Sequence, residues 1–445
     1  MGRKQHIGGR PIKHHAIFAL MLAVGAVCAA PAVAQAPPTA AAPQSAIAVR
    51  ADEVVALLNG KVAPNDVFSA SFLAAVPPAQ IKALSANLTA QLGAAVEVAL
   101  LNPRDGIRAA LEIRFERGLA KGGIAIDPAQ EGRISELVFT AVDALAVAGD
   151  TPAAIAADLA ALPGTVNAVF APLNGGAPII SVGADTRLAL GSAFKLYVLA
   201  ALGEDVKAGR RRWTDVVALT EKSYPSGQLQ DWPQGAPVTL HTLASMMISI
   251  SDNTATDQLI AELGQPRILQ VMRDSGHADP GANGVFLKTR ELFVLKASDP
   301  AILQAWRARD GAGKVAILLA EVAHSKPALE TINAAFAGGP KALDIEWFAS
   351  PADLAKLLAH MRAVADPAVF DILAINPSAT PAIQANWDYI GYKGGSEPGV
   401  LNLTWLLRDT AGRDYILTLG WNNPAAALDD GKLLAIARRI LLLPH

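Results

Sequence analysis

The chain has 445 residues, a single cysteine and a formal net charge of −2. At about 150 residues per domain this length predicts two or three domains, and the 52% content of hydrophobic residues excludes intrinsic disorder as the main state. One cysteine excludes an internal disulfide scaffold, and the charge lacks the basic excess of nucleic-acid-binding proteins, so no nucleic-acid partner is expected.

The first 34 residues follow the pattern of a secretory signal peptide. Four basic residues precede an uncharged apolar run at 16–30, and Ala32-Val33-Ala34 offers a cleavage site before Gln35. The run is short for a membrane anchor, which needs about 20 residues. We therefore expect cleavage, a secreted or periplasmic protein, no membrane span in the mature chain and a net charge of −6. Lipidation of Cys28 is the alternative, although the residues before it make a poor lipobox.

Residues 35–46 are rich in alanine and proline and predict an extended or flexible tether. Residues 47–148 predict a small α+β domain. Helical spacing at 54–58, 68–75 and 78–92 precedes strand signals at 111–115, 124–126 and 134–142. Leu111, Ile113 and Phe115 alternate with charged residues, which is the period of a strand with one buried face. Helices followed by an antiparallel meander predict a curved sheet wrapped on helices.

A second domain, residues 149–445, begins at a helix start, Asp150-Thr151-Pro152. Strands are expected at 166–171 and 179–182, followed by a long helical region with extra helices near 299–344. Further strands are expected at 389–393, 401–407 and 415–419, and a closing helix at 424–443. A sheet whose strands come from both ends of a domain, with helices between them, predicts an α/β sandwich.

The first segment with chemistry-bearing residues is Ser192-Ala193-Phe194-Lys195, which follows Gly191 and opens an apolar helix. Residues three apart share a helix face, so the Lys195 amine can lie beside the Ser192 hydroxyl. A lysine that accepts a proton activates a serine nucleophile, and a helix N-terminus favours developing negative charge. The same spacing also fits an N-cap serine followed by a solvated lysine.

Two further segments carry polar residues. Ser251-Asp252-Asn253 lies between helical stretches at 240–248 and 254–263. It fits either a helix cap or a proton-shuttling Ser251 with a positioning Asn253. Lys393-Gly394-Gly395-Ser396 lies on an expected strand, where glycines let a substrate approach the backbone. The alternative is an edge-strand lysine that enters a glycine turn.

In this order the three segments resemble the S-x-x-K, S-D-N and K-T-G motifs of the serine β-lactamase and penicillin-binding-protein superfamily. The resemblance covers roughly residues 150–443. It implies a β-lactamase-like fold, with an antiparallel sheet flanked by helices and an all-helical subdomain, and a small-molecule acyl substrate, a β-lactam or an ester. The roles it implies are nucleophile for Ser192, base or base partner for Lys195, proton relay for Ser251, carboxylate ligand for Lys393, oxyanion-hole amides for Ser192 and Ser396, and substrate contact for Asn253, Gly394, Gly395 and Ser396.

The chain departs from the superfamily pattern in two places. The third motif is K-G-G, so the hydroxyl expected at Gly394 is missing unless Ser396 supplies one. The Glu-x-x-Leu-Asn segment that carries the deacylation base does not follow Ser251. Glu291 lies in about the right place and can be a base or a structural partner of Arg290, and the structural interpretation is favoured. Slow turnover of β-lactams is expected for that reason.

Tyr224, in the segment Tyr224-Pro225-Ser226-Gly227, is expected on a loop over the site, where it either stacks on substrate or is an ordinary turn tyrosine. With the N-terminal α+β domain, the chain resembles a two-domain subgroup that includes a hydrolase of the clavulanic-acid gene cluster and mycobacterial lipoproteins. That resemblance implies a cystatin/NTF2-like N-terminal domain and weak β-lactamase or esterase action. The rivals are a D-Ala peptidase, a purely penicillin-binding envelope protein and a non-catalytic envelope binding protein. No cofactor and no metal are expected, because no histidine pair has zinc-ligand spacing, and a monomer is expected.

Overall fold

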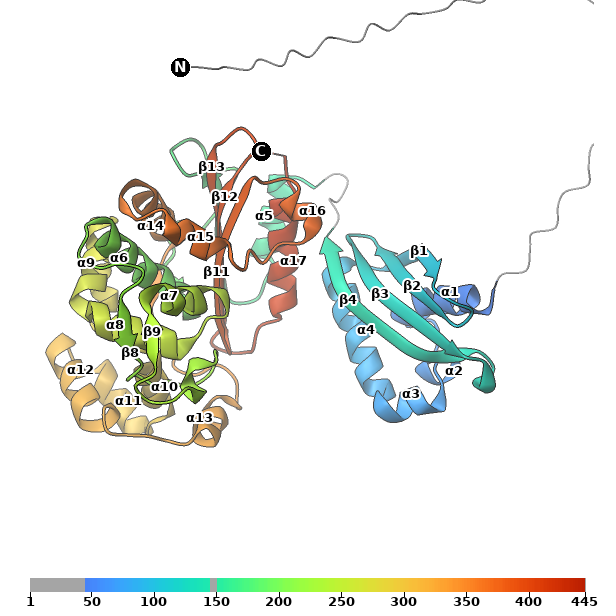
Figure 1. The fold of residues 1–445 in the computed structure, drawn as a ribbon, viewed down its shortest axis with the longest axis horizontal. Helices are drawn as coiled ribbons and strands as arrows, with labels where there is room; N and C mark the ends of the chain where they lie inside the picture. Colours follow the sequence, from blue (N-terminus) through green and yellow to red (C-terminus); the bar gives the residue numbers. More distant parts are fainter. Residues whose placement is uncertain (1–44, 145–149, 445) are drawn as a thin grey trace, which may run out of the picture. The chain divides into compact units, whose positions relative to one another are not determined.

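The computed structural model describes residues 45–144 and 150–444 (Figure 1). The predicted signal peptide, Cys28 and almost all of the predicted tether lie outside the described residues. So do residues 145–149, in which the expected domain boundary falls. In the two described ranges, no helix is long and apolar enough to cross a membrane.

Residues 45–144 form four helices followed by a four-stranded antiparallel meander in the order β1-β2-β3-β4. The elements are α1 (Ala46–Leu58), α2 (Pro64–Val67), α3 (Ala70–Ala75), α4 (Pro78–Leu92), β1 (Ala95–Pro103), β2 (Arg108–Phe115), β3 (Gly118–Asp127) and β4 (Arg133–Ala144). Helix α1 packs on β1, β2 and β3. Leu111, Ile113 and Phe115 of β2 are fully buried while their neighbours in the strand are partly exposed, so the predicted alternation is confirmed.

Several details of this region differ from the predictions. The helix expected at 54–58 begins at Ala46, the last residue of the predicted tether. The helical stretch predicted at 68–75 begins only at Ala70, because Phe68 forms a bridge to Ile134 and Ser69 caps the helix by accepting a hydrogen bond from Phe72 N. Strand β1 was not predicted. Most of its residues are exposed or partly exposed, so it lacks the buried alternation by which a strand is recognised in a sequence.

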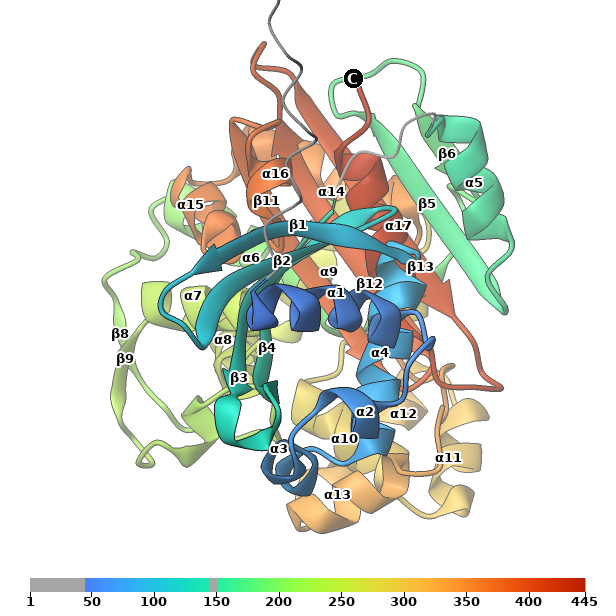
Figure 2. The same ribbon diagram turned by 90° about the vertical axis from the view of Figure 1, so that its right-hand side faces the viewer.

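In the C-terminal part a five-stranded antiparallel sheet has the order β11-β12-β13-β5-β6. Its strands are β5 (Thr165–Pro172), β6 (Ile180–Val182), β11 (Tyr389–Glu397), β12 (Val400–Arg408) and β13 (Asp414–Asn422). Figure 2 shows β5 running along β13, although more than 240 residues separate them, and the pairing of Val169 with Thr418 fixes their register. The sheet built from both ends of the domain is thus confirmed.

Helices cover both faces of this sheet (Figure 1). Helix α5 (Pro152–Ala160) and helix α17 (Asp430–Leu441) enclose one apolar core with the strands. Helix α6 (Lys195–Lys207) and helix α14 (Pro351–Val364) pack against the other face in a second core. The closing helix begins at Asp430 and not at 424, so that boundary was predicted six residues too early.

The long helical region is confirmed between the first and last strands. It holds α7 (Leu240–Ser249), α8 (Asn253–Leu263), α9 (Gln265–Asp274), α10 (Thr289–Ala297), α11 (Pro300–Arg307), α12 (Gly311–Ile317), α13 (Leu329–Phe336), α15 (Ala368–Ala374) and α16 (Pro381–Gln384), with a short π-helical turn at Leu318–Val322. Two small two-stranded sheets flank it, β8 (Val216–Ala218) with β9 (Pro237–Thr239) and β7 (Leu188–Ala189) with β10 (Phe348–Ala349). Strand β11 is an edge strand, so one side of its backbone faces these helices without a pairing strand.

Candidate active site

Ser192 lies in a 3₁₀ turn, Gly191–Phe194, directly before α6. The turn meets β11 at very close range. A Cβ atom on Gly395 would lie 2.4 Å from the Ser192 nitrogen, and one on Gly191 would lie 2.9 Å from the Ser396 nitrogen. Only glycine fits at both positions, and Gly191 also has a φ of 49°. Because the two backbones are in close contact, the segments that carry the Ser192 and Ser396 amides, the two predicted oxyanion donors, lie next to each other.

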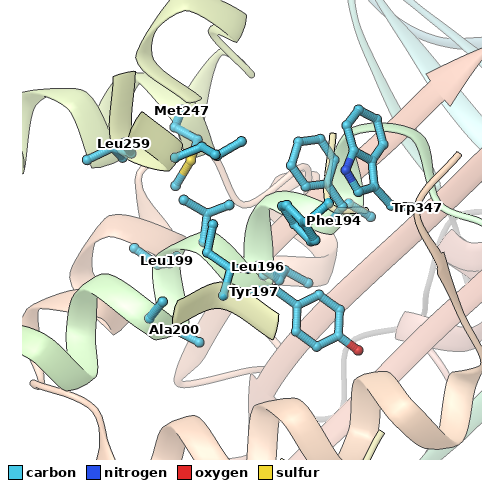
Figure 3. Close-up of a cluster of buried hydrophobic side chains, with 14 of the residues drawn as sticks. Phe194, Leu196, Tyr197, Leu199, Ala200, Met247, Leu259 and Trp347 are labelled. Atoms are coloured by element: carbon cyan, nitrogen blue, oxygen red, sulfur yellow. The ribbon is translucent and has the colours of Figure 1, made fainter. Parts of the chain in front are cut away.

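Aromatic packing fixes this turn from behind. Phe194 stacks on Trp347 with ring centroids 3.7 Å apart and planes 15° apart, and both residues are labelled in Figure 3. The Trp347 carbonyl accepts a hydrogen bond from Leu190 N at 2.9 Å, and its indole N–H donates to the Leu287 carbonyl at 3.1 Å. Both side chains are almost completely buried. The nucleophile turn is therefore held by a rigid core, as a site that must keep its geometry requires.

Lys195 is the first residue of α6 and is fully buried. Its Nζ donates to the Ser251 carbonyl at 2.8 Å, to Ser251 Oγ at 3.1 Å and to Asn253 Oδ1 at 2.7 Å. These acceptors take up the three donors of an ammonium group. Burial, together with the positive charge of Lys393, holds the pKa of Lys195 well below its usual range. This shift favours the neutral amine relative to an exposed lysine, and a neutral amine has a lone pair that can take a proton from a serine hydroxyl.

Ser251 sits in the turn between α7 and α8 with a φ of 58°. Asp252 caps α8 by accepting from Ala255 N at 2.8 Å, and its second oxygen accepts from the backbone amides of Gln228 and Leu229 at 2.6 and 2.9 Å. Asn253 donates to the Tyr224 carbonyl at 3.2 Å. The helix cap and the proton-relay geometry are therefore compatible, because Asp252 makes the cap and leaves the Ser251 hydroxyl to the lysines.

Lys393 comes from β11 and is 3% exposed. Its Nζ lies 3.1 Å from Ser251 Oγ and also donates to the Gly394 carbonyl. Burial lowers the pKa of Lys393 to about 7. Ser251 Oγ thus lies between two buried lysine amines whose pKa values are both depressed. A hydroxyl in this position can pass a proton from one amine toward a group in the cavity.

A cavity of about 620 Å³ opens over these groups. The predicted site residues that line it are Ser192, Ser251, Asn253, Lys393, Gly394, Gly395 and Ser396. Lys195 lies behind them, covered by Ser251 and Asn253. The structure thus brings the three sequence segments to one cavity, from three different elements.

Comparisons with known proteins decide the family. A model of the beta-lactamase enzyme family matches residues 151–441, well over half of the chain. The chain belongs to the beta-lactamase enzyme family. The expected β-lactamase-like fold of this part is thereby confirmed.

Similar solved structures include a beta-lactamase from Sphaerobacter thermophilus DSM 20745, at 23% identity and a TM-score of 0.46, covering 66% of this chain and 98% of that one. A point mutant of PBP-A, in an acyl-enzyme complex with penicillin G, is 18% identical with a TM-score of 0.45, covering 65% and 94%. A beta-lactamase from Chitinophaga pinensis DSM 2588 is 15% identical with a TM-score of 0.43, covering 65% and 96%. No curated protein matches.

Glu291, the candidate deacylation base of this beta-lactamase-family protein, is engaged in a helix cap. Its Oε2 accepts from the Lys288 backbone N–H at 2.8 Å at the start of α10, and it does not line the cavity. Its expected structural partner was Arg290, but the partner is the Lys288 backbone; Arg290 instead donates to the Ser325 carbonyl. Burial raises the pKa of Glu291. The geometry therefore gives Glu291 a structural contact.

The α10 residue that does line the cavity is Phe293. Asp257 of α8 holds the start of α10 in place, since it accepts from Thr289 N at 2.6 Å and from Arg290 N at 2.9 Å. Burial raises the pKa of Asp257 to about 6. Side chains two residues apart on a helix point about 200° apart. With Glu291 directed into the cap at the start of α10, Phe293 is therefore directed toward the cavity.

Tyr224 is placed outside the cavity lining. Its ring packs edge-on against Phe293, with centroids 6.2 Å apart, and its hydroxyl donates to the Pro327 carbonyl at 2.6 Å. The next residues of its loop, Pro225 and Ser226, do line the cavity. Sequence analysis missed Phe293 and Asp257. Their positions relative to the other residues of their helices are the only feature of the sequence that could have indicated them. Within the described residues no cluster of three or more metal-ligating side chains occurs.

Proposed function

We propose that this protein is a secreted serine hydrolase that forms an acyl-enzyme on Ser192 with β-lactams, which it hydrolyses slowly, or with small esters. The observation that carries the proposal is the position of Ser251 Oγ, 3.1 Å from both Lys195 Nζ and Lys393 Nζ, in the cavity that Ser192 lines. Secretion rests on the basic, apolar and small-residue segments of residues 1–34.

Acylation would begin when the Ser192 hydroxyl attacks the carbonyl carbon of the substrate. The neutral Lys195 amine, favoured by its lowered pKa, takes the serine proton as the new O–C bond forms. The backbone N–H groups of Ser192 and Ser396 would stabilise the negative charge that develops on the carbonyl oxygen. The rigid packing behind the turn supports this role, because donors that are already oriented cost no reorganisation during the reaction.

Breaking the C–N bond of a lactam requires a proton for the leaving nitrogen. The Ser251 hydroxyl can donate it and recover one from the Lys195 ammonium, so the proton taken from Ser192 ends on the leaving group. Lys393, in its charged form, would hold the carboxylate that β-lactams carry. Glu291 is engaged in a helix cap and does not line the cavity, which supports slow release.

Three rival functions differ in what acylates Ser192 and in whether the acyl group is released. A D-Ala peptidase would be acylated by peptides that end in D-alanyl-D-alanine. A purely penicillin-binding envelope protein would be acylated and never released, and a non-catalytic protein would not be acylated. The paired buried lysines favour an active site over a non-catalytic one. Burying two amines costs free energy, and a protein that only keeps the fold does not need these lysines.

The proposal is tested by intact-mass spectrometry of the mature protein after incubation with penicillin G, with p-nitrophenyl acetate and with a D-alanyl-D-alanine peptide. We expect a mass increase equal to the acyl group with the first two, located on Ser192 by peptide mapping. Ser192→Ala should carry no adduct. An adduct from the peptide alone would support the peptidase, and an adduct of normal yield on Ser192→Ala would overturn the assignment of the nucleophile.

The lowered pKa of Lys393 predicts that affinity for carboxylate-bearing substrates depends on pH. Lys393 is an ammonium below about pH 7 and becomes neutral above it. Affinity for a carboxylate-bearing substrate should therefore fall as the pH rises through about 7, and a neutral ester should lack this loss. Lys393→Ala should weaken binding of the anionic substrate and flatten its pH profile. Apparent affinities from acylation progress curves between pH 5.5 and 9 would measure this, and equal pH profiles for the two substrates would contradict the role of Lys393.

A further inference from the structure

One face of β11 carries a tyrosine next to the position at which the third motif lacks its hydroxyl. Tyr392 and Gly394 are two residues apart on the strand, so they share a face. A Cβ atom on Gly394 would lie 2.1 Å from Tyr392 Oη and 2.9 Å from its Cζ. The tyrosine hydroxyl therefore occupies the space into which a side chain at position 394 would extend. A threonine at 394 is excluded as long as the tyrosine is there.

This hydroxyl is fixed and protonated. The Tyr392 ring lies against Trp405 with centroids 4.7 Å apart, and the Ser378 side chain interacts with its hydroxyl. Burial raises the pKa of Tyr392 to about 12, so the group keeps its proton at neutral pH and can donate a hydrogen bond. Tyr392 and Ser378 both line the cavity that holds Ser192 and Lys393.

We propose that Tyr392 is a substrate-binding residue whose hydroxyl supplies the hydrogen bond that the K-G-G segment cannot make, and that together with Lys393 it holds the carboxylate of an anionic acyl substrate. The inference rests on the proposed function, since it names a further ligand for that substrate. A hydroxyl donor and an ammonium group that line the same cavity are together suited to an anion. Asp430 also lines the cavity, and burial and the charge of Asp429 raise its pKa.

Tyr392→Phe tests the hydroxyl alone, because it keeps the ring against Trp405. The second-order rate constant for acylation by a fluorescent penicillin should fall about 10- to 100-fold, the usual effect of losing a hydrogen bond to a charged group. The loss with p-nitrophenyl acetate, which has no carboxylate, should be at least about fivefold smaller. Tyr389→Phe is the matched control. It removes a hydroxyl from the same strand that donates to the Phe370 carbonyl outside the cavity, and it should leave both rate constants unchanged.

A double variant provides a rescue. Tyr392→Ala removes the ring that excludes a side chain at 394, and adding Gly394→Thr should restore preference for the penicillin relative to Tyr392→Ala alone. A double variant no more selective than Tyr392→Ala would count against the inference, and the result with Tyr392→Phe stands if the double variant does not fold. Equal losses for both reagents in Tyr392→Phe, or no loss, would overturn the inference while leaving the proposed function intact. Failure of both reagents to acylate the wild-type protein would overturn the proposed function itself.

Discussion

Replacing Lys195 with alanine is expected to slow acylation of Ser192 by about 10²–10⁴-fold, the usual contribution of a general base. The lysine is buried, its pKa is well below the usual range, and its Nζ contacts Ser251 and Asn253. Without the amine the serine hydroxyl has no group to take its proton, and Ser251 loses one of its two lysine neighbours. The loss should appear with β-lactam and ester alike, because the proton transfer is common to both.

Lys195→Met keeps much of the volume of the lysine stem and separates the loss of the amine from the loss of packing. Both variants should retain cooperative thermal unfolding, and both should show the slow acylation. The rate constants come from time courses of intact mass. If Lys195→Met were acylated at the rate of the wild-type protein, Lys195 would be a structural lysine and the base would have to be sought elsewhere, with Lys393 as the next group.

The three chemistry-bearing segments could be found in the sequence because each is local. Ser192 and Lys195 lie three residues apart, and Ser251 and Asn253 two apart, and such spacing is visible without a fold. What joins them is not local. The sequence predicts that Lys195 lies beside Ser192. In the structure its Nζ donates hydrogen bonds to Ser251 and Asn253, because the turn after α7 lies over the start of α6.

The relation of Tyr392 to Gly394 shows the same limit. The missing hydroxyl at 394 is plain in the sequence, and strand periodicity places Tyr392 on the same face. That the tyrosine hydroxyl fills the vacant place depends on the ring's packing against Trp405, which belongs to the neighbouring strand. Likewise Glu291 could be a base from its position in the chain, whereas its hydrogen bond with the Lys288 backbone N–H is visible only in the structure.

Most of the fold followed from periodicity and end signals. The strands at 166–171 and 401–407 are mostly apolar and were placed within a residue or two. The closing helix was started too early because Ala425, Ala426 and Ala427 are good helix formers, whereas the chain continues as a loop until Asp430. Propensity alone could not locate that boundary, since packing against the sheet decides where the helix begins.

Phe293→Glu is expected to raise the rate of deacylation by about 100-fold or more, turning a slow hydrolase into a faster one. Phe293 lines the cavity from α10, with Ser192, Ser251 and Asn253 on its other walls. A carboxylate there would face the acyl group and could take a proton from a water that attacks it. Phe293→Gln is the matched control, because it has nearly the same shape and hydrogen-bonding atoms as glutamate but cannot act as a base.

Glu291→Ala should change deacylation by less than about 10-fold, because a true general base usually contributes 10²–10⁴-fold. Its main effect should be a modest loss of stability, since Glu291 closes the cap of α10 through the Lys288 N–H. Deacylation would be followed as the decay of the penicilloyl adduct by intact mass. An adduct that accumulates in Glu291→Ala but not in the wild-type protein would make Glu291 the base. A Phe293→Glu variant that is no faster than Phe293→Gln would show that the attacking water approaches from another wall, because a base acts only within hydrogen-bond reach of the proton it removes.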